Sequence, residues 1–197
     1  TNYIAIDGFN MKDGSYGIRS VGLSPEQAAH QIGIAILNND ISGQYKDPIF
    51  TAQSDWTVIE SNLAYNAGKG DGHGIYISNG SDWNIIRRNE LFNNPSSDLQ
   101  INADPLSTCF EYRISYDSLK CHGEANEGHG RGASDHMLIE YNYLHDGLGQ
   151  GPNFTSMRSS IVRKNIIGPY ERHGTSFWQE TETPELGSSN NEIINNI

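Results

Sequence analysis

Two short segments of the chain carry the side-chain types that proton transfer requires. Asp71 and His73 precede an alternating segment that contains Tyr76, and Arg172 and His173 precede a second such segment. Elimination from a uronic acid needs a base that removes the proton beside the carboxylate, an acid for the leaving oxygen, and a cation that stabilises the enolate-like state. The candidate catalytic residues that match these roles by type are His73, Tyr76, Arg131, Arg172 and His173.

Carboxylates near the same segments leave a second reaction open. Hydrolysis of a glycosidic bond needs two carboxylates flanking that bond, and the candidates by type are Asp71, Asp104, Glu180 and Glu182. Asp71 and Asp104 are also the candidate metal ligands, and calcium is the cofactor that carboxylate oxygens would hold. No calcium-loop pattern surrounds them, and the spacing of the histidines matches no zinc motif.

The elements that position these residues repeat along the chain. An aliphatic residue, two further residues, Asn, and a second aliphatic residue recur, as in 59–63 and 86–91. At intervals of 23 to 31 residues, the repeated position is occupied by Asn39, Asn62, Asn89, Asp117, Asn142, Asn165 and Asn196. Drifting periods of this length indicate a solenoid of stacked units whose loops differ in length.

Short alternating runs show which solenoid this is. Residues 74–78 and 98–102 alternate with a period of two and are bounded by turn-forming residues, which predicts parallel strands joined by tight turns. We expect each Asn to adopt left-handed backbone at a corner and to pair its amide with the Asn residues above and below. Residues 1–197 then form one all-β domain of about seven to eight coils. Because the chain begins and ends within the pattern, we expect it to be incomplete and to lack capping coils.

Some segments depart from the plain coil. The sequence from Ser24 to Gln27 fits a capping box, which predicts a short helix over 24–31. Residues 120–136 lack apolar periodicity and are predicted to form a long loop. Basic residues just before the repeated Asn, such as Arg87 and Arg163, are expected to pair with acidic residues on neighbouring coils.

The repeated phrase, from Ile4 to Ile197, resembles the right-handed parallel β-helix family, which includes pectate lyases, polygalacturonases and tailspikes. The resemblance implies a secreted or cell-surface protein whose partner is a polysaccharide. Residues 72–74, Gly-His-Gly, also resemble a segment of polygalacturonase-type glycoside hydrolases in which the His supports an acidic pair. The paired acids of those hydrolases are absent here, so the correspondence is confined to His73. One fold hosts unrelated chemistries; a polysaccharide lyase acting on an acidic polysaccharide and a noncatalytic glycan-binding or structural solenoid both remain open.

The direction in which side chains face distinguishes a groove from a core. If the aliphatic residues of the alternating segments point inward, the outward side chains on one face are Tyr76, Ser78, Gln100, Asn102, Ser176 and Trp178. Aromatic rings stack on sugar rings and amides bond to hydroxyl groups. The predicted substrate-binding residues are Gln100, Asn102 and Trp178 on this face, together with Lys69, an ionisable residue that precedes one of these strands. The alternative is an ordinary solvated sheet face.

The charge and apolar content of the chain exclude some classes of binding partner. With 13 Lys and Arg against 24 Asp and Glu, the formal net charge is −11, which argues against nucleic acid and anionic membranes. The same charge repels a polyanion unless a local basic groove or bound cations reverse the field. No apolar run is long enough to cross a bilayer, and uncapped coils predict self-association. Cys109 and Cys121 could close a small loop in a secreted protein, whereas in a cytosolic protein they would be two buried thiols.

Overall fold

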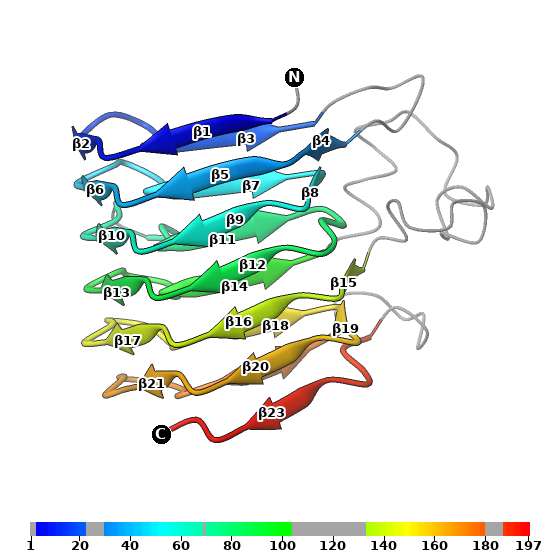
Figure 1. Cartoon of the computed structure of the whole chain (residues 1–197). Coiled ribbons are helices and arrows are strands. Elements are labelled where there is room, and N and C mark those ends of the chain that lie inside the picture. Colours follow the sequence, from blue (N-terminus) through cyan, green and yellow to red (C-terminus); the bar gives the residue numbers. More distant parts are fainter. Residues whose placement is uncertain (1–2, 23–29, 69, 104–132, 180–186) are drawn as a thin grey trace.

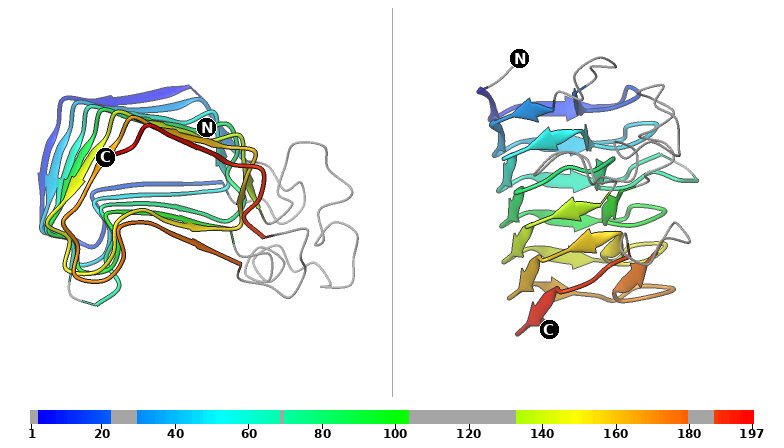
Figure 2. Two further views of the ribbon diagram at one scale, coloured as in Figure 1. Left: turned by 90° about the horizontal axis from the view of Figure 1, so that it is seen from below. Right: turned by 90° about the vertical axis from the view of Figure 1, so that its right-hand side faces the viewer.

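The protein is a parallel β-helix, as the sequence predicts. The computed structural model describes residues 3–22, 30–68, 70–103, 133–179 and 187–197, and in this part of the chain all regular structure is β-strand. Three parallel sheets run along the solenoid, one of seven strands and two of six, and each coil contributes one strand to each (Figure 1). Viewed along the axis, successive coils superpose (Figure 2).

The strands of each sheet follow one another at successive coils. Sheet A comprises β1 (Ile4–Asp7), β5 (Ile34–Leu37), β9 (Val58–Glu60), β12 (Ile85–Arg87), β16 (Leu138–Glu140), β20 (Ile161–Arg163) and β23 (Glu192–Ile194). Sheet B comprises β2 (Asn10–Lys12), β6 (Asp40–Ser42), β10 (Leu63–Tyr65), β13 (Glu90–Phe92), β17 (Tyr143–His145) and β21 (Ile166–Ile167). Sheet C comprises β3 (Ile18–Val21), β7 (Ile49–Ala52), β11 (Ile75–Ser78), β14 (Leu99–Asn102), β18 (Asn153–Thr155) and β22 (Ser176–Trp178). Two further pairs join β4 (Gln31–Ile32) to β8 (Ser54–Asp55), and β15 (Ser134–Asp135) to β19 (Met157–Arg158).

The core is a stack of aliphatic side chains inside the coils. In sheet A, Ile36, Ile59, Ile86 and Ile139 occupy one register column and are completely buried. In sheet C, the inward positions carry Ile and Leu and then Phe154, whose ring centroid lies 5.2 Å from that of Phe177. Since alternate residues of a strand face opposite sides, this inward column leaves the intervening residues of sheet C on the outer face.

A continuous ladder of Asn side chains joins the coils between sheets A and B. The Nδ2 of Asn89 donates to Oδ1 of Asn142 at 3.0 Å and to the carbonyl oxygen of Ile59 at 2.9 Å. The same arrangement recurs from Asn39 to Asn62 and from Asn165 to Asn196. The buried amides therefore form bonds along the axis, as predicted from the repeat.

The ladder corrects one repeat assignment. Asp117 lies outside the described residues, and Asn89 and Asn142 are neighbouring rungs, because their side chains bond directly and β12 pairs directly with β16. The described chain consequently forms six sets of three strands followed by β23, fewer than the seven to eight coils expected from counting Asp117.

The expected left-handed corner also lies one residue earlier than predicted. The residue before each ladder Asn has positive φ, including Ser61 at 57°, Arg88 at 55° and Tyr141 at 57°. The Asn itself is absent from the residues with positive φ. The ladder Asn contributes its side-chain amide. The residue before it adopts the left-handed backbone conformation, which residues other than glycine rarely adopt.

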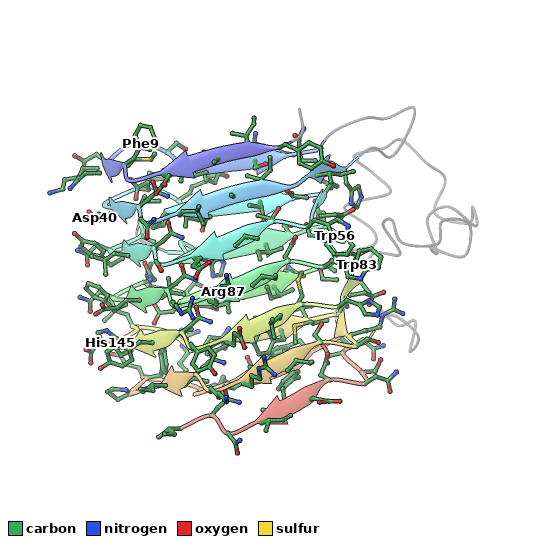
Figure 3. All side chains as sticks on the ribbon, in the orientation of Figure 1. Phe9, Asp40, Trp56, Trp83, Arg87 and His145 are labelled. Carbon is green, nitrogen blue, oxygen red and sulfur yellow. The ribbon has the colours of Figure 1, made fainter. Side chains whose placement is uncertain are left out.

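Charged side chains on the outer face of sheet A pair between coils, as predicted. Glu60 accepts from Arg87 at 2.8 Å and from Arg88 at 2.6 Å, and Glu140 accepts from Arg163. Arg87 lies on the face drawn in Figure 3. Each of these cations has an acidic partner within the protein, with Arg87 and Arg88 sharing the carboxylate of Glu60.

Both predicted departures from the coil fall largely outside the described residues. Within the segment expected to be helical, residues 23–29 are not described and Gln31 begins β4. Within the expected loop, residues 120–132 are not described, while Ser134 and Asp135 form β15. Cys109 and Cys121 also lie outside the described residues. In the described part of the chain, no helix has the length and apolarity needed to span a bilayer.

Candidate functional site

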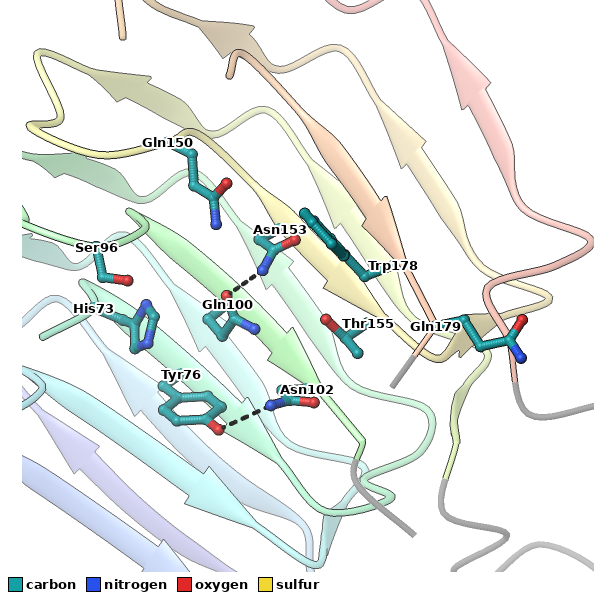
Figure 4. Close-up of a pocket in the computed structure, with 10 residues that line it drawn as sticks. All are labelled: His73, Tyr76, Ser96, Gln100, Asn102, Gln150, Asn153, Thr155, Trp178 and Gln179. Atoms are coloured by element: carbon teal, nitrogen blue, oxygen red, sulfur yellow. Dashed lines mark hydrogen bonds between the residues drawn. The ribbon is translucent and has the colours of Figure 1, made fainter. Parts of the chain in front are cut away.

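The outer face of sheet C holds a pocket with a volume of about 440 Å³. Strand register builds it: Tyr76 aligns with Gln100, which aligns with Asn153, and Asn102 aligns with Thr155, which aligns with Trp178. The complete lining is His73, Tyr76, Ser96, Gln100, Asn102, Gln150, Asn153, Thr155, Trp178 and Gln179 (Figure 4). The pocket therefore spans the outer face of four adjacent strands, β11, β14, β18 and β22.

His73 lines the pocket as a neutral hydrogen-bond donor. Burial lowers the pKa of His73 from 6.5 to about 4, against the opposing charge of Asp71. The backbone N–H of Ser97 donates to Nδ1 at 3.2 Å, so Nδ1 must keep its lone pair and the neutral ring carries its proton on Nε2. A neutral imidazole of this tautomer donates a hydrogen bond and cannot accept one at Nε2. This differs from the role of a base that the residue type allows.

A relay of amides orients Gln100. The Ser176 hydroxyl donates to Oδ1 of Asn153 at 2.7 Å, and Nδ2 of Asn153 donates to Oε1 of Gln100 at 2.9 Å. Ser97 Oγ also donates to Oε1 of Gln100, at 3.2 Å. With its oxygen engaged twice, Gln100 presents Nε2, which carries two N–H donors, as the remaining end of its amide. The relay thus places a fixed donor on the pocket floor.

Tyr76 is the second titratable side chain that lines the pocket. Its hydroxyl accepts a hydrogen bond from Nδ2 of Asn102 at 3.4 Å, and its ring meets those of His73 and Phe50 edge-on, with centroids 4.8 and 5.3 Å away. At the other end of the pocket, the ring of Trp178 is 56 % exposed.

Two buried carboxyl groups support the pocket from behind. Asp47 accepts the backbone N–H of His73 at 2.8 Å, and burial raises the pKa of Asp47 to about 6. Asp98 precedes β14 and accepts from the Tyr170 hydroxyl and from Asn94, both at 2.6 Å. Burial raises the pKa of Asp98 to about 7. Neither carboxyl group lines the pocket, so their function here is to hold the turns that precede β11 and β14.

The structure brings together some of the sequence-predicted residues and leaves others apart. His73, Tyr76, Gln100, Asn102 and Trp178 all line the pocket, which places them on one face as expected. Three other predicted residues, Asp71, Arg172 and His173, are exposed and do not line it. Lys69, Asp104 and Arg131 lie outside the described residues. No three His, Cys, Asp or Glu of the described chain are grouped so as to hold a metal ion.

Five lining residues were missed by the sequence analysis: Ser96, Gln150, Asn153, Thr155 and Gln179. Asn153 and Thr155 stand in the strand that aligns with 100–102, and alternation along that strand would have found them. Gln150 could have been found by extending the register backwards, because it pairs with Ser97 in an isolated bridge. Ser96 and Gln179 carry no such signal, since each lies just outside a strand.

Comparisons with known proteins identify the fold. No protein-family model matches the chain, and no curated protein matches it in sequence. Two solved structures are similar: the periplasmic alginate epimerase AlgG, with a TM-score of 0.65, and a point mutant of that enzyme, with a TM-score of 0.66. Both are 14 % identical to this chain and match all of it, whereas the match covers 46 % of the solved chains. At this identity the likeness establishes the β-helix and not the chemistry.

Proposed function

We propose that the protein is a carbohydrate-active β-helix that binds an acidic polysaccharide on the outer face of sheet C and cleaves it by elimination, as a polysaccharide lyase. The observation that carries the proposal is the pocket, where Tyr76 and His73 stand beside the fixed amide of Gln100. The alignment with an alginate epimerase over the whole chain adds support, since that enzyme acts on an acidic polysaccharide.

The pocket residues divide the reaction between them. The proton beside a uronate carboxylate becomes acidic only when the charge spreading onto the carboxylate is stabilised. Gln100 Nε2 and the Nε2–H of His73 are neutral donors suited to that charge, as a neutral imidazole can polarise a carbonyl group. Tyr76 as phenolate removes the proton, and the bond to the leaving glycosidic oxygen then breaks as the new carbon–carbon double bond forms. The Tyr76 hydroxyl returns the proton to that oxygen, so Tyr76 ends as it began.

The test is the ultraviolet absorbance of the unsaturated uronate product during incubation with alginate, polygalacturonate and other acidic polysaccharides. We expect absorbance to rise with one of them, and Tyr76→Phe to reduce the rate by at least about a hundredfold. Tyr65→Phe is the matched control, because Tyr65 lies on sheet B and stacks on Phe92 away from the pocket. Parallel reactions with chelator and with added calcium test whether calcium, the cofactor expected from the sequence, is required. Absence of product and of new reducing ends with every polymer contradicts the lyase proposal.

Epimerisation is the second candidate, favoured by the alginate epimerases that share the fold. It begins with the same proton removal but returns a proton to the opposite face of the sugar. The titratable side chains among the described lining residues, His73 and Tyr76, both arise on or just before β11, which favours chemistry on one face of the ring. Deuterium incorporation from heavy water without a rise in absorbance would identify an epimerase. Glycan binding without either change would identify a noncatalytic solenoid.

A location outside the cytoplasm belongs to the same proposal. The alginate epimerase with the same fold is periplasmic, and polymeric acidic glycans are substrates met outside the cell membrane. Fractionation of cells that express the native gene tests this expectation, and recovery of the protein only in the cytoplasm would contradict it.

A further inference from the structure

The outer face of sheet C continues beyond the pocket toward the N-terminal coils. In register, Tyr76 is followed by Phe50 in β7 and then by Arg19 in β3. Neighbouring strands are about 4.8 Å apart, so Arg19 lies two coils, or roughly 10 Å, from the pocket. Trp178 lies at the opposite end, which makes one continuous surface along the solenoid axis.

Two cations surround a pair of aromatic rings at this N-terminal end. The rings of Tyr16 and Phe50 have centroids 5.4 Å apart. The guanidinium carbon of Arg19 lies 5.7 Å from both centroids, and Nζ of Lys46 lies 5.5 Å from that of Tyr16. The rings hold the cations in place through cation–π attraction, while the polar ends of both side chains stay at the surface.

The charge of this end is not neutralised by an ion pair with the described chain. Neither Arg19 nor Lys46 forms a salt bridge with a described residue, whereas Arg87 and Arg163 are both paired with glutamates. Asp47 adjoins Lys46 and, against the larger effect of burial, the charge of Lys46 lowers the pKa of that carboxyl group, but the group is buried, accepts the backbone N–H of His73 and forms no ion pair with Lys46. In a protein of net charge −11, two exposed cations beside aromatic rings form a local basic surface.

We propose that Arg19, Lys46, Tyr16 and Phe50 form a second glycan-binding subsite, which takes an anionic sugar unit of the same chain that occupies the pocket. The proposal rests on the proposed function for the identity of the ligand. The rings pack against the face of the sugar, and the two cations bind its carboxylate by charge-assisted hydrogen bonds. An acidic polymer would thus lie along the axis, crossing the strands of sheet C.

The subsite explains how an acidic protein retains a polyanion. Its unpaired cations reverse the local field where the chain enters, while the rest of the surface repels it. The pocket itself is lined, among described residues, by neutral amide, hydroxyl, imidazole and aromatic groups. Carboxylate recognition by fixed positive charge is therefore concentrated at the Arg19 end, and the pocket supplies hydrogen-bond donors.

The experiment is a calorimetric titration of the full chain with alginate and polygalacturonate oligomers of graded length, and with carboxyl-reduced oligomers of the same lengths. The double variant Arg19→Gln, Lys46→Gln is compared with Lys12→Gln, which removes an exposed charge on sheet B. We expect the double variant to weaken long acidic oligomers about tenfold and to leave the shortest oligomers that bind unchanged. The difference should shrink at high salt.

The outcomes separate this inference from the proposed function. Equal binding of long acidic oligomers by wild type and double variant, with loss only in the pocket variant Gln100→Ala, overturns the subsite and leaves the proposed function standing. Failure of wild type to bind any acidic oligomer overturns both. If the double variant loses affinity equally for acidic and for carboxyl-reduced oligomers, the subsite is also overturned, because the cations would then not bind the carboxylate. Unchanged melting temperatures exclude unfolding as the cause.

Discussion

Replacing His73 by Gln tests the neutral imidazole on which the proposed chemistry depends. The pKa of His73 is lowered from 6.5 to about 4 by burial, against the opposing charge of Asp71. Above pH 6.5 the ring is neutral in both the folded and the unfolded chain. As pH falls below 6.5, the unfolded chain binds a proton at His73 that the folded chain does not bind. The free energy of unfolding therefore decreases until the pH reaches the folded pKa of about 4.

The size of the effect follows from that interval. Between 6.5 and about 4, the linkage amounts to up to about 3 kcal/mol of folding free energy. His73→Gln removes this acid-induced loss, and Gln can still accept the Ser97 N–H through its oxygen. We therefore expect the variant to be less stable than wild type at pH 7.5 and to recover about 2 kcal/mol relative to it by pH 4.5.

The assay is urea unfolding of both chains at the two pH values, followed by tryptophan fluorescence. Comparing variant with wild type at each pH cancels the titration of the buried carboxyl groups, which both chains share. The exposed His173→Gln is the matched control, and its effect on stability should be small. A stability difference for His73→Gln that stays constant between pH 7.5 and 4.5 would refute the reasoning.

Three further predictions concern the scaffold. Asn89→Leu should lower the free energy of unfolding by about 3 kcal/mol or more, because it leaves several buried donors and acceptors unpaired. Asn196→Leu, at the end of the ladder, should lower it by about 1 kcal/mol. Equal losses for the two variants in urea unfolding would contradict a stabilising role of the ladder. Gly74→Ala places a Cβ 2.6 Å from a carbonyl oxygen of the next coil and should lower the melting temperature, while Gly174→Ala, with nothing within 4 Å at an equivalent register position, should not. Burial raises the pKa of Asp82 from 3.8 to about 8, so the contribution of the protonated carboxyl group to stability is lost as pH rises toward 8. Asp82→Asn should therefore flatten the decline of the melting temperature between pH 5 and 8.5. An unchanged dependence of melting temperature on pH would show that Asp82 does not cause the decline.

The fold was predictable because the repeat is a local signal with a physical cause. Each ladder Asn must place a buried amide against its neighbours, and that requirement marks the sequence once per coil. Counting Asp117 gave too many coils, because a local sequence pattern does not show which coils are neighbours. The direct bond between Asn89 and Asn142 shows that these two residues are neighbouring rungs.

The sequence predicted which side chains of the candidate site share a sheet face, but it did not predict the protonation state that decides their chemical roles. Alternation placed Tyr76, Gln100, Asn102 and Trp178 on one face, and the register confirms that placement. The tautomer of His73 could not be predicted, because it depends on the backbone N–H of a residue one coil away. Residue type alone left base and donor equally open.

By itself, the sequence determined the solenoid, the strand periodicity and the set of side chains that face outward, because these depend on spacing within one coil. Tertiary structure decided which coils are neighbours and which cations remain unpaired. Arg87 and Arg19 are the same residue type on outer sheet faces, yet Arg87 pairs with Glu60 on the preceding coil and Arg19 contacts two aromatic rings. That difference arises across the stacking of coils, where residues far apart in sequence share an environment that sequence spacing does not encode.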